Sequence, residues 1–311
     1  MRITELTEAS IPAILAAWHS VLVHDQVSEP EFRRVIPRDP NYEPDAVRVA
    51  WDDDGSVAGL GAFLVRRTVP GKDGCGQNYE FQEGFLKAFF VVDGEVGERA
   101  ADLLLEAGEA YCAAAGKSQV SVVGYAGPYV FPGIDVRYER LRDVLSRRGY
   151  RDVRTIEDVA VDLRGAHVPA LLKRTWKRVG STVELLTWTP DLLPLLQELF
   201  ATGDQPQWFP AGWESRYSEA DEHVLVLREG GKLIAWARFH PGTPAGWFGP
   251  IMVLPSERGN GYGNLLLLES MVRASAQGTE SMSAGWAATG FYVANGWHII
   301  RRYAVFQKEL S

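Results

Sequence analysis

The chain has 311 residues, 46% of them hydrophobic, and a formal net charge of −8. This length allows one large core or two of ordinary size, and the usual domain size favours two. The acidic balance disfavours nonspecific nucleic-acid binding and favours a cationic small substrate. Apolar runs are too short to cross a bilayer, no leader pattern precedes the first strand, and the two cysteines form no CxxC pair. These features predict a cytoplasmic protein without a membrane, disulfide or metal site.

The same order of elements occurs twice along the chain. A short strand is followed by a helix that starts with Ser or Thr, at 3–7 and 11–18 in the first half and at 183–187 and 191–200 in the second. A β-hairpin comes next in each half, with its tight turn at Asp54-Gly55 and at Gly230-Gly231. The sequence therefore predicts a diverged repeat of one α/β domain.

The two halves also end alike and differ mainly in turn-rich insertions. Leucine-rich helix segments at 103–106 and 266–269 precede Arg148-Gly149-Tyr150 and Asn295-Gly296-Trp297. The first half has extra residues around 70–78 and 125–135, where insertions leave a core undisturbed. We therefore predict domains at 1–165 and 181–311, joined by a helical connector at 166–180. The basic side chains of the connector are expected to form a solvated face rather than a ligand site; they are Lys173, Arg174, Lys177 and Arg178.

A glycine-rich turn joins a strand to a helix in the second half. The apolar run 251–254 leads into it, and a helix pattern at 265–272 follows. Such a turn aims free backbone N–H groups and the positive end of a helix dipole at one point, which suits a phosphate. A Walker A loop is excluded because its Lys-Ser/Thr pair is absent, and a dinucleotide fingerprint would need glycine at Asn264. The alternative is an ordinary strand-to-helix turn.

The turn carries the pattern Val-x-Pro-x-x-Arg-x-x-Gly-x-Gly, formed by Val253, Pro255, Arg258, Gly261 and Gly263. It resembles the pyrophosphate loop of the Gcn5-related N-acetyltransferases (GNAT), and the order of elements is similar to that family's fold over nearly the whole chain. The resemblance implies an α/β fold with a mixed sheet, two tandem acyl-CoA N-acyltransferase domains, and acetyl-CoA as cosubstrate. It also implies a set of pyrophosphate-binding residues: Arg258, Gly259, Asn260, Gly261, Tyr262 and Gly263.

The first half lacks the features of this loop. Aligned on the repeat, Glu95, Glu98 and Ala100 take the places of the loop's arginine and two glycines. Two carboxylates facing a pyrophosphate would repel it. We therefore expect a degenerate first domain that binds no coenzyme A and a second domain that binds acetyl-CoA.

The strand before the loop is interrupted by Gly249-Pro250, which predicts a β-bulge, the alternative being a simple irregularity. In the GNAT family such a bulge splays two strands and lets pantetheine enter between them. The resemblance implies that backbone groups of Ile251 and Val253 bond the pantetheine amides. It further implies that an N–H near Met252 points at the thioester oxygen.

Tyr292 is the candidate catalytic acid. The run 291–297 resembles the family's Tyr-x-x-x-Gly-Phe, whose tyrosine lies near the coenzyme sulfur in many members. A phenol with an ordinary pKa of about 10 stays protonated at neutral pH and can protonate a departing thiolate. The alternative is that Tyr292 only packs its helix against the sheet. Gly285 stands where the family often has Asn, which puts the coenzyme contacts of that region in doubt.

A general base is not evident, because the strand at 247–254 contains no Asp, Glu or His. Glu222, His223 and His240 are the nearby candidates, although such side chains are often simply exposed. A water chain could serve instead, with proximity supplying most of the catalysis.

Acceptor specificity is expected in the aromatic segment 205–217, which could instead seal the interface between the halves. Its candidate substrate-binding residues are Trp208, Phe209, Trp213 and Tyr217. The leading hypothesis is an acyltransferase for groups other than aminoacyl groups. It would move acetyl from acetyl-CoA to a primary amine of a small molecule or peptide, by direct attack in a ternary complex, as a monomer or homodimer. The alternatives are a noncatalytic acyl-CoA sensor and an aminoacyl-tRNA-dependent transferase, the latter weakened by the intact loop and the acidic balance.

Overall fold

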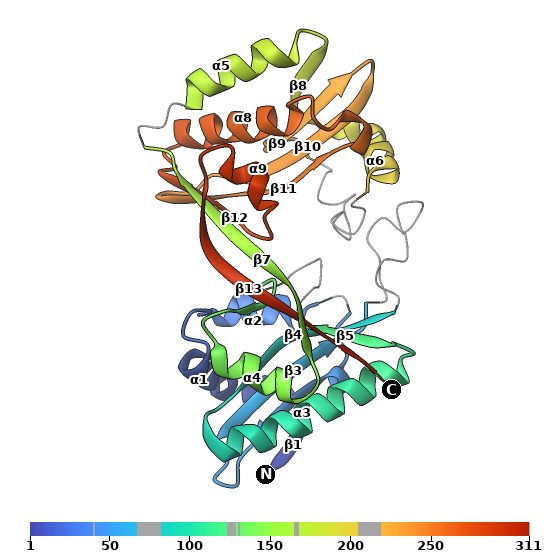
Figure 1. Cartoon of the computed structure of the whole chain (residues 1–311), viewed down its shortest axis with the longest axis vertical. Coiled ribbons are helices and arrows are strands. Elements are labelled where there is room, and N and C mark those ends of the chain that lie inside the picture. Colours follow the sequence, from blue (N-terminus) through green and yellow to red (C-terminus); the bar gives the residue numbers. More distant parts are fainter. Residues whose placement is uncertain are drawn as a thin grey trace. The chain divides into compact units, whose positions relative to one another are not determined.

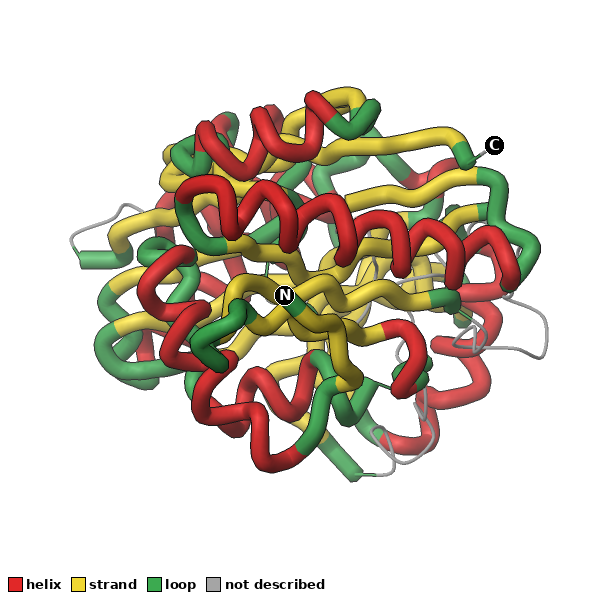
Figure 2. The backbone as a smooth tube through the Cα atoms, turned by 90° about the horizontal axis from the view of Figure 1, so that it is seen from below, coloured by secondary structure: helices red, strands yellow, loops and turns green. Residues whose placement is uncertain are grey.

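The computed structural model describes residues 1–39, 41–66, 82–122, 129, 131–164, 168–204 and 219–310. The described chain divides into two compact units, the first within 1–156 and 302–311 and the second at Glu157–Arg301. In each unit helices flank a mixed β-sheet (Figures 1 and 2), so the predicted fold class is confirmed. Among the described residues, no helix is long and apolar enough to span a membrane.

The first unit is built on a sheet with strand order β1-β2-β3-β4-β5-β13. Neighbouring strands are antiparallel except β4 and β5, which are parallel. The strands are β1 (Arg2–Glu5), β2 (Val47–Trp51), β3 (Val57–Leu64), β4 (Glu83–Val91), β5 (Gln119–Val122), β6 (Ile134–Asp135), which pairs with β13, and β13 (His298–Glu309). The helices are α1 (Ile11–Val21), α2 (Glu29–Val35), α3 (Gly94–Ala114) and α4 (Glu139–Arg147), with 3-10 turns at Glu8–Ser10 and Pro44–Ala46.

The second unit repeats this plan with strand order β7-β12-β11-β10-β9-β8. Here the parallel pair is β11 and β12. The strands are β7 (Arg151–Asp162), β8 (Val183–Trp188), β9 (Asp221–Glu229), β10 (Lys232–His240), β11 (Ala245–Val253) and β12 (Ser281–Ala284). The helices are α5 (Val168–Val179), α6 (Leu193–Thr202), α8 (Tyr262–Ala276) and α9 (Thr289–Val293), with 3-10 turns at Pro190–Leu192 and Pro255–Glu257.

Both predicted hairpins are present. In the first unit β2 pairs with β3, and in the second β9 pairs with β10. Their turns use glycines in the left-handed region, with φ of 86° at Gly55, 56° at Gly230 and 82° at Gly231. Glycine adopts these angles without a Cβ penalty, which is why the paired turns could be placed from sequence.

The last strand of each sheet lies far in sequence from the strand that it pairs with. Gln307 near the C-terminus pairs with Ser121 of β5 in the first unit. Conversely, Asp162 of β7 pairs with Ser281 of β12 in the second unit. The first unit therefore takes its last strand from the C-terminal end of the chain, and the second takes its last strand from residues before α5; the domain boundaries at 165 and 181 stay a prediction.

Helices cover both faces of the second unit's sheet. The apolar run Leu265–Leu268 of α8 is buried on one face together with Phe239 and Phe248. On the other face Phe200 of α6 packs edge-on against Trp236, with ring centroids 5.4 Å apart. Because neighbouring residues of a strand point to opposite faces, the two clusters show which face each side chain of β10 and β11 occupies.

Some predicted features lie outside the described residues. The insertion at 70–78 lies there entirely, the one at 125–135 does so in part, and so do the four aromatic residues proposed for the acceptor. Helix α5 lies within the segment predicted as a connector, and its side chains Leu172, Trp176 and Val179 pack against the core on the α8 side.

The pairing of β7 with β12 gives a prediction for truncated chains. A fragment of residues 181–311 lacks β7 and α5, so it would expose the edge of β12 and the apolar surface that α5 covers. We expect it to aggregate, whereas a fragment of residues 157–301 retains α5 and the part of β7 that pairs with β12, and should be the more soluble of the two. Size-exclusion chromatography of both fragments measures this. A monomeric, fully active 181–311 fragment would contradict the prediction.

Candidate functional site

The glycine-rich turn of the second unit opens helix α8. Gly259 and Gly261 have φ of 86° and 91°, in the left-handed region that favours glycine. The first intrahelical bond runs from the amide of Leu265 to the oxygen of Gly261, at 3.0 Å. The amides of the preceding first turn, from Tyr262 onward, therefore have no acceptor within the helix. Together with the helix dipole, they form an arrangement suited to an anion.

A basic side chain that the sequence analysis assigned to a solvated face lies over this turn. The guanidinium of Arg178, near the end of α5, is 2.2 Å from the position that a Cβ at residue 261 would take. Gly261 therefore leaves room for a cation beside the free amides. Gly263 serves a different contact, because a Cβ there would lie 3.2 Å from the ring of Phe291 on α9. The local sequence around Arg178 contains no signal for this placement, since α5 reaches the turn only by packing on α8.

Arg258 has an internal partner. Its Nη2 is 2.6 Å from Asp204 Oδ1, just beyond α6, and its Nε donates to the oxygen of Val253 at 3.3 Å. Asn260 is likewise bonded within the turn, through Nδ2 to the oxygen of Glu257 at 3.3 Å. Cofactor binding by these two side chains stays a prediction.

Strands β11 and β12 separate before the turn. Their parallel pairing ends at Trp247 and Ser283, while β11 continues to Val253 paired with β10 on its other side. The predicted bulge is present. One residue separates Ala237 from Phe239 on β10, whereas two residues, Gly249 and Pro250, separate their partners Ile251 and Phe248 on β11. Beyond the bulge, the β12 side of β11 has no strand partner among the described residues, so an extended ligand could pair there.

Tyr292 lies on α9 within an aromatic cluster. Its ring centroid is 6.2 Å from that of Phe248 and 5.2 Å from that of Trp297, and the side chain is buried. Burial raises the pKa of the phenol, so the group stays protonated at neutral pH. Asn295 ties the end of α9 to α8 by donating to Asn264 Oδ1 at 3.3 Å. These contacts fit both the packing role and the predicted acid role of Tyr292, and the latter stays a prediction.

The candidate bases belong to a polar cluster at the ends of β9 and β10. The Nδ1 atom of His223 is 3.4 Å from Asp221 Oδ1, and Arg238 reaches the other oxygen of Asp221 at 3.3 Å. Burial, and then the charge of Arg238, lowers the pKa of His240. His240 is therefore neutral at neutral pH and able to accept a proton. Both histidines and Glu222 were predicted from the sequence, but Asp221 and Arg238 were not; they come from the start of β9 and the end of β10, which lie together at the open end of the hairpin.

In the first unit, the connection between β4 and α3 corresponds to the glycine turn of the second unit. Only Val92 and Asp93 separate β4 from α3, so Glu95 and Glu98 lie inside the helix rather than in a loop. The expectation that these two carboxylates face a pyrophosphate cradle is therefore wrong in its placement. A helix that begins directly after the strand leaves no loop to form such a cradle.

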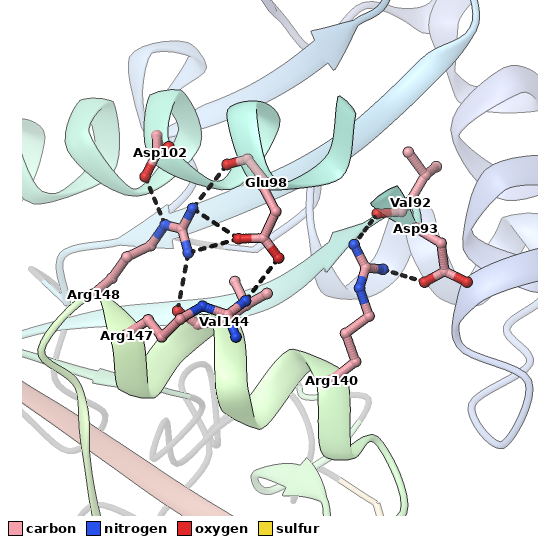
Figure 3. Close-up of polar contacts among 8 residues, drawn as sticks. All are labelled: Val92, Asp93, Glu98, Asp102, Arg140, Val144, Arg147 and Arg148. Atoms are coloured by element: carbon pink, nitrogen blue, oxygen red, sulfur yellow. Dashed lines mark hydrogen bonds and ion pairs between the residues drawn. The ribbon is translucent and has the colours of Figure 1, made fainter. Parts of the chain in front are cut away.

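Arginines at the end of helix α4 form hydrogen bonds and ion pairs with α3, as Figure 3 shows. Arg147 Nη2 is 2.7 Å from one carboxylate oxygen of Glu98, and Arg148 donates to the Glu98 backbone oxygen at 2.8 Å and to Asp102 at 2.8 Å. Burial alone would raise the pKa of Glu98, but the two arginines lower it. The carboxylate is thus held ionised between two helices.

No group of three or more His, Cys, Asp or Glu side chains in the described part of the chain is placed to hold a metal ion. The site of the second unit is instead a glycine turn, an unpaired strand edge and a buried tyrosine. These features suit an extended, phosphate-bearing ligand.

Comparisons with known proteins agree with this geometry. The model of the Acetyltransferase (GNAT) family matches residues 189–297. A glucosamine N-acetyltransferase region of a fungal multi-domain GH3 beta-N-acetylglucosaminidase superposes with a TM-score of 0.79 at 16% identity, covering 98% of this chain and 38% of that longer one. A GCN5-related N-acetyltransferase from Sphaerobacter thermophilus gives 0.69 at 18% identity, with 99% and 95% coverage. No curated protein sequence matches the chain.

A tandem GNAT protein from the clavulanic acid biosynthesis pathway also superposes on the whole chain. Its TM-score is 0.61 at 13% identity, and the match covers 100% of this chain and 98% of that one. The fold and the family match support an N-acyltransferase. Residues 189–297 match the Acetyltransferase (GNAT) family model, and the chain as a whole has the fold of a tandem GNAT protein.

Proposed function

We propose that this protein transfers an acetyl group from acetyl-CoA to a primary amine of a small molecule, using the second unit. The observation that carries the proposal is the opening of α8 by a glycine turn beside the unpaired edge of β11. The turn can bind the pyrophosphate of the cofactor, and the strand edge beside it can pair with the extended pantetheine arm. Arg178 adds positive charge at the turn.

In this proposal backbone groups of Ile251 and Val253 bond the pantetheine amides, and an N–H near Met252 polarises the thioester carbonyl. The amine nitrogen attacks in a ternary complex, so that an N–C bond forms while the C–S bond breaks. Of the two protons that an ammonium acceptor loses, one ends on the coenzyme thiol and the other passes to solvent. Bringing the two substrates together supplies most of the rate enhancement.

The test combines binding with turnover. Calorimetry should show one acetyl-CoA per chain, and a thiol-release assay with a panel of amines should identify acceptors. Glucosamine belongs in the panel because a structural neighbour is a glucosamine N-acetyltransferase region. Two coenzymes per chain, or no binding, would contradict the proposal. Tight binding without thiol release from any amine would favour an acyl-CoA sensor, a role consistent with the lack of Asp, Glu and His on β11.

The predicted acid role of Tyr292 has its own test. If the phenol protonates the leaving thiolate, Tyr292→Phe should lower kcat roughly 100-fold, at the low end for a general acid because a thiolate is already a tolerable leaving group. Acetyl-CoA affinity should hardly change, because the phenylalanine ring retains the contacts with Phe248 and Trp297. Steady-state kinetics with an identified amine measure the effect. A variant that turns over at the wild-type rate would assign Tyr292 to packing alone.

A further inference from the structure

Trp247 places an exposed indole at the point where β11 and β12 part. It is 39% exposed, although most large aromatic side chains of this sheet are covered. The ring lies across the opening between the strands. Its Nε1 is 3.9 Å from the position that a Cβ at Gly249 would take, and its Cη2 is 2.8 Å from the corresponding position at Gly285. The exposed part of the ring is therefore accessible to a ligand at this opening.

The same contact explains why residue 285 is glycine. A side chain there would collide with the Trp247 ring, so the indole takes the space that an asparagine would need. The departure from the family pattern at Gly285 is therefore coupled to Trp247. The two residues form one surface beside the opening.

A carboxylate of strand β7 borders this surface. Asp158 belongs to β7, and its Oδ1 is 3.1 Å from the same Cβ position at Gly285. Because the Trp247 ring is 2.8 Å from that position, the carboxylate and the indole are neighbours. Oδ1 also accepts a hydrogen bond from the amide of Trp286 at 3.2 Å. Trp286 has φ of 52°, a left-handed conformation that is costly for tryptophan, and such strain is concentrated at functional sites.

A neutral imidazole lies opposite Trp247 on the neighbouring strand. His240 is the Cα partner of Trp247 across β10 and β11, so the two side chains point to the same face of the sheet. The lowered pKa of His240 leaves its imidazole neutral at neutral pH. The charged and titratable groups around it are Arg238, Asp221 and His223, and the cation among them is paired with Asp221. An exposed indole, a carboxylate and a neutral imidazole together favour a cation.

We propose that the positively charged amine of the acceptor binds between the indole face of Trp247 and the carboxylate of Asp158. This inference rests on the proposed function and adds to it the chemistry of the acceptor, a protonated amine, and a residue of β7 that takes part in the second unit's site. The indole attracts the cation through its π face, and the carboxylate accepts a charge-assisted hydrogen bond from the ammonium. The site lies beside the strand opening at which the thioester is proposed to lie.

The experiment compares ligands that differ only in charge. Calorimetry with the full chain saturated with coenzyme A measures the affinity for benzylamine and glucosamine, each against its hydroxyl counterpart, benzyl alcohol and glucose. The wild type should prefer the amine of at least one pair by about tenfold or more. Asp158→Asn keeps the acceptor for the Trp286 amide and should abolish the preference. Trp247→Leu should weaken binding of the same amine about tenfold.

Asp162→Asn is the matched control, because Asp162 lies on the same strand, is exposed, and pairs with Arg164 at 2.8 Å. It should keep the preference. The inference is overturned if the wild type binds no amine better than its alcohol, or if Asp158→Asn retains the preference. Coenzyme A binding is measured on the same samples. Its absence would contradict the proposed function, whereas an amine preference lost only in Asp158→Asn supports the acceptor site regardless of turnover.

Discussion

Gly261→Glu should weaken acetyl-CoA binding to the second unit roughly 1000-fold. The residue has φ of 91°, and a side chain there would meet the guanidinium of Arg178. The new carboxylate would pair with Arg178 and face the pyrophosphate at close range. Two like charges about 4 Å apart at a partly solvated site cost on the order of 4 kcal/mol, which corresponds to that loss. Isothermal calorimetry with acetyl-CoA measures it.

The matched control is Gly278→Glu. Gly278 follows the other end of α8 and has φ of 88°, so the substitution introduces the same backbone strain away from the turn. It should lower stability without reducing affinity. If Gly261→Glu binds acetyl-CoA as tightly as this control does, the turn is not the pyrophosphate site.

Lys87→Met should destabilise the first unit by about 3 to 5 kcal/mol, the usual cost of removing one partner from a buried ion pair. Lys87 stands at a bulge in β4, where Ala88 pairs with Ala62 and Leu86 with Phe63. Its ammonium is bonded to Asp39, and the two side chains are 1% and 0% exposed. Burial, partly offset by Asp39, lowers the pKa of Lys87 to about 8.

Urea unfolding of the full chain, followed by hydrogen exchange of the β4 amides, measures the loss in the first unit. Lys232→Met is the control, because Lys232 is 74% exposed and 3.9 Å from Glu198, a geometry in which ion pairs contribute little. Adding Asp39→Asn to Lys87→Met should recover part of the stability, since the amide can still accept the bond from the Asn41 amide. Equal stability of Lys87→Met and Lys232→Met would show that the buried pair is not needed.

Local features of the second unit's site could be read from the sequence. The Gly230-Gly231 turn and the Gly249-Pro250 bulge were placed correctly, and the helix predicted over 265–272 is present as α8, which starts three residues earlier at Tyr262. Each depends on backbone conformations that a few adjacent residues decide, mainly through glycine's access to positive φ and proline's missing N–H. The hydrophobic periods of strand and helix act over similarly short distances.

The alignment of the two halves was wrong where it assumed that the connection from β4 to α3 is as long as the one from β11 to α8. The sequence comparison put Glu95 and Glu98 in a cradle, but α3 starts two residues after β4 and carries both glutamates within the helix. Helix α3 is longer at its start than α8, and the pairing of Glu98 with Arg147 and Arg148 involves residues about fifty positions away. Residues so far apart in sequence have no local pattern that shows their contact.

By itself, the sequence determined the repeat, the glycine turn and the bulge, because these follow from the preferences of neighbouring residues, whereas the mixed-sheet fold was implied by the resemblance to the GNAT family. Only the tertiary structure decided which strand completes each sheet, that Arg178 lies at the turn, and that Asp158 lies beside Trp247. Strand partners are selected by burial and edge pairing over the whole unit, so β7 satisfies the edge of β12 from across the chain. The proposed acceptor site therefore depends on β7, a strand about a hundred residues before the cofactor turn in the sequence.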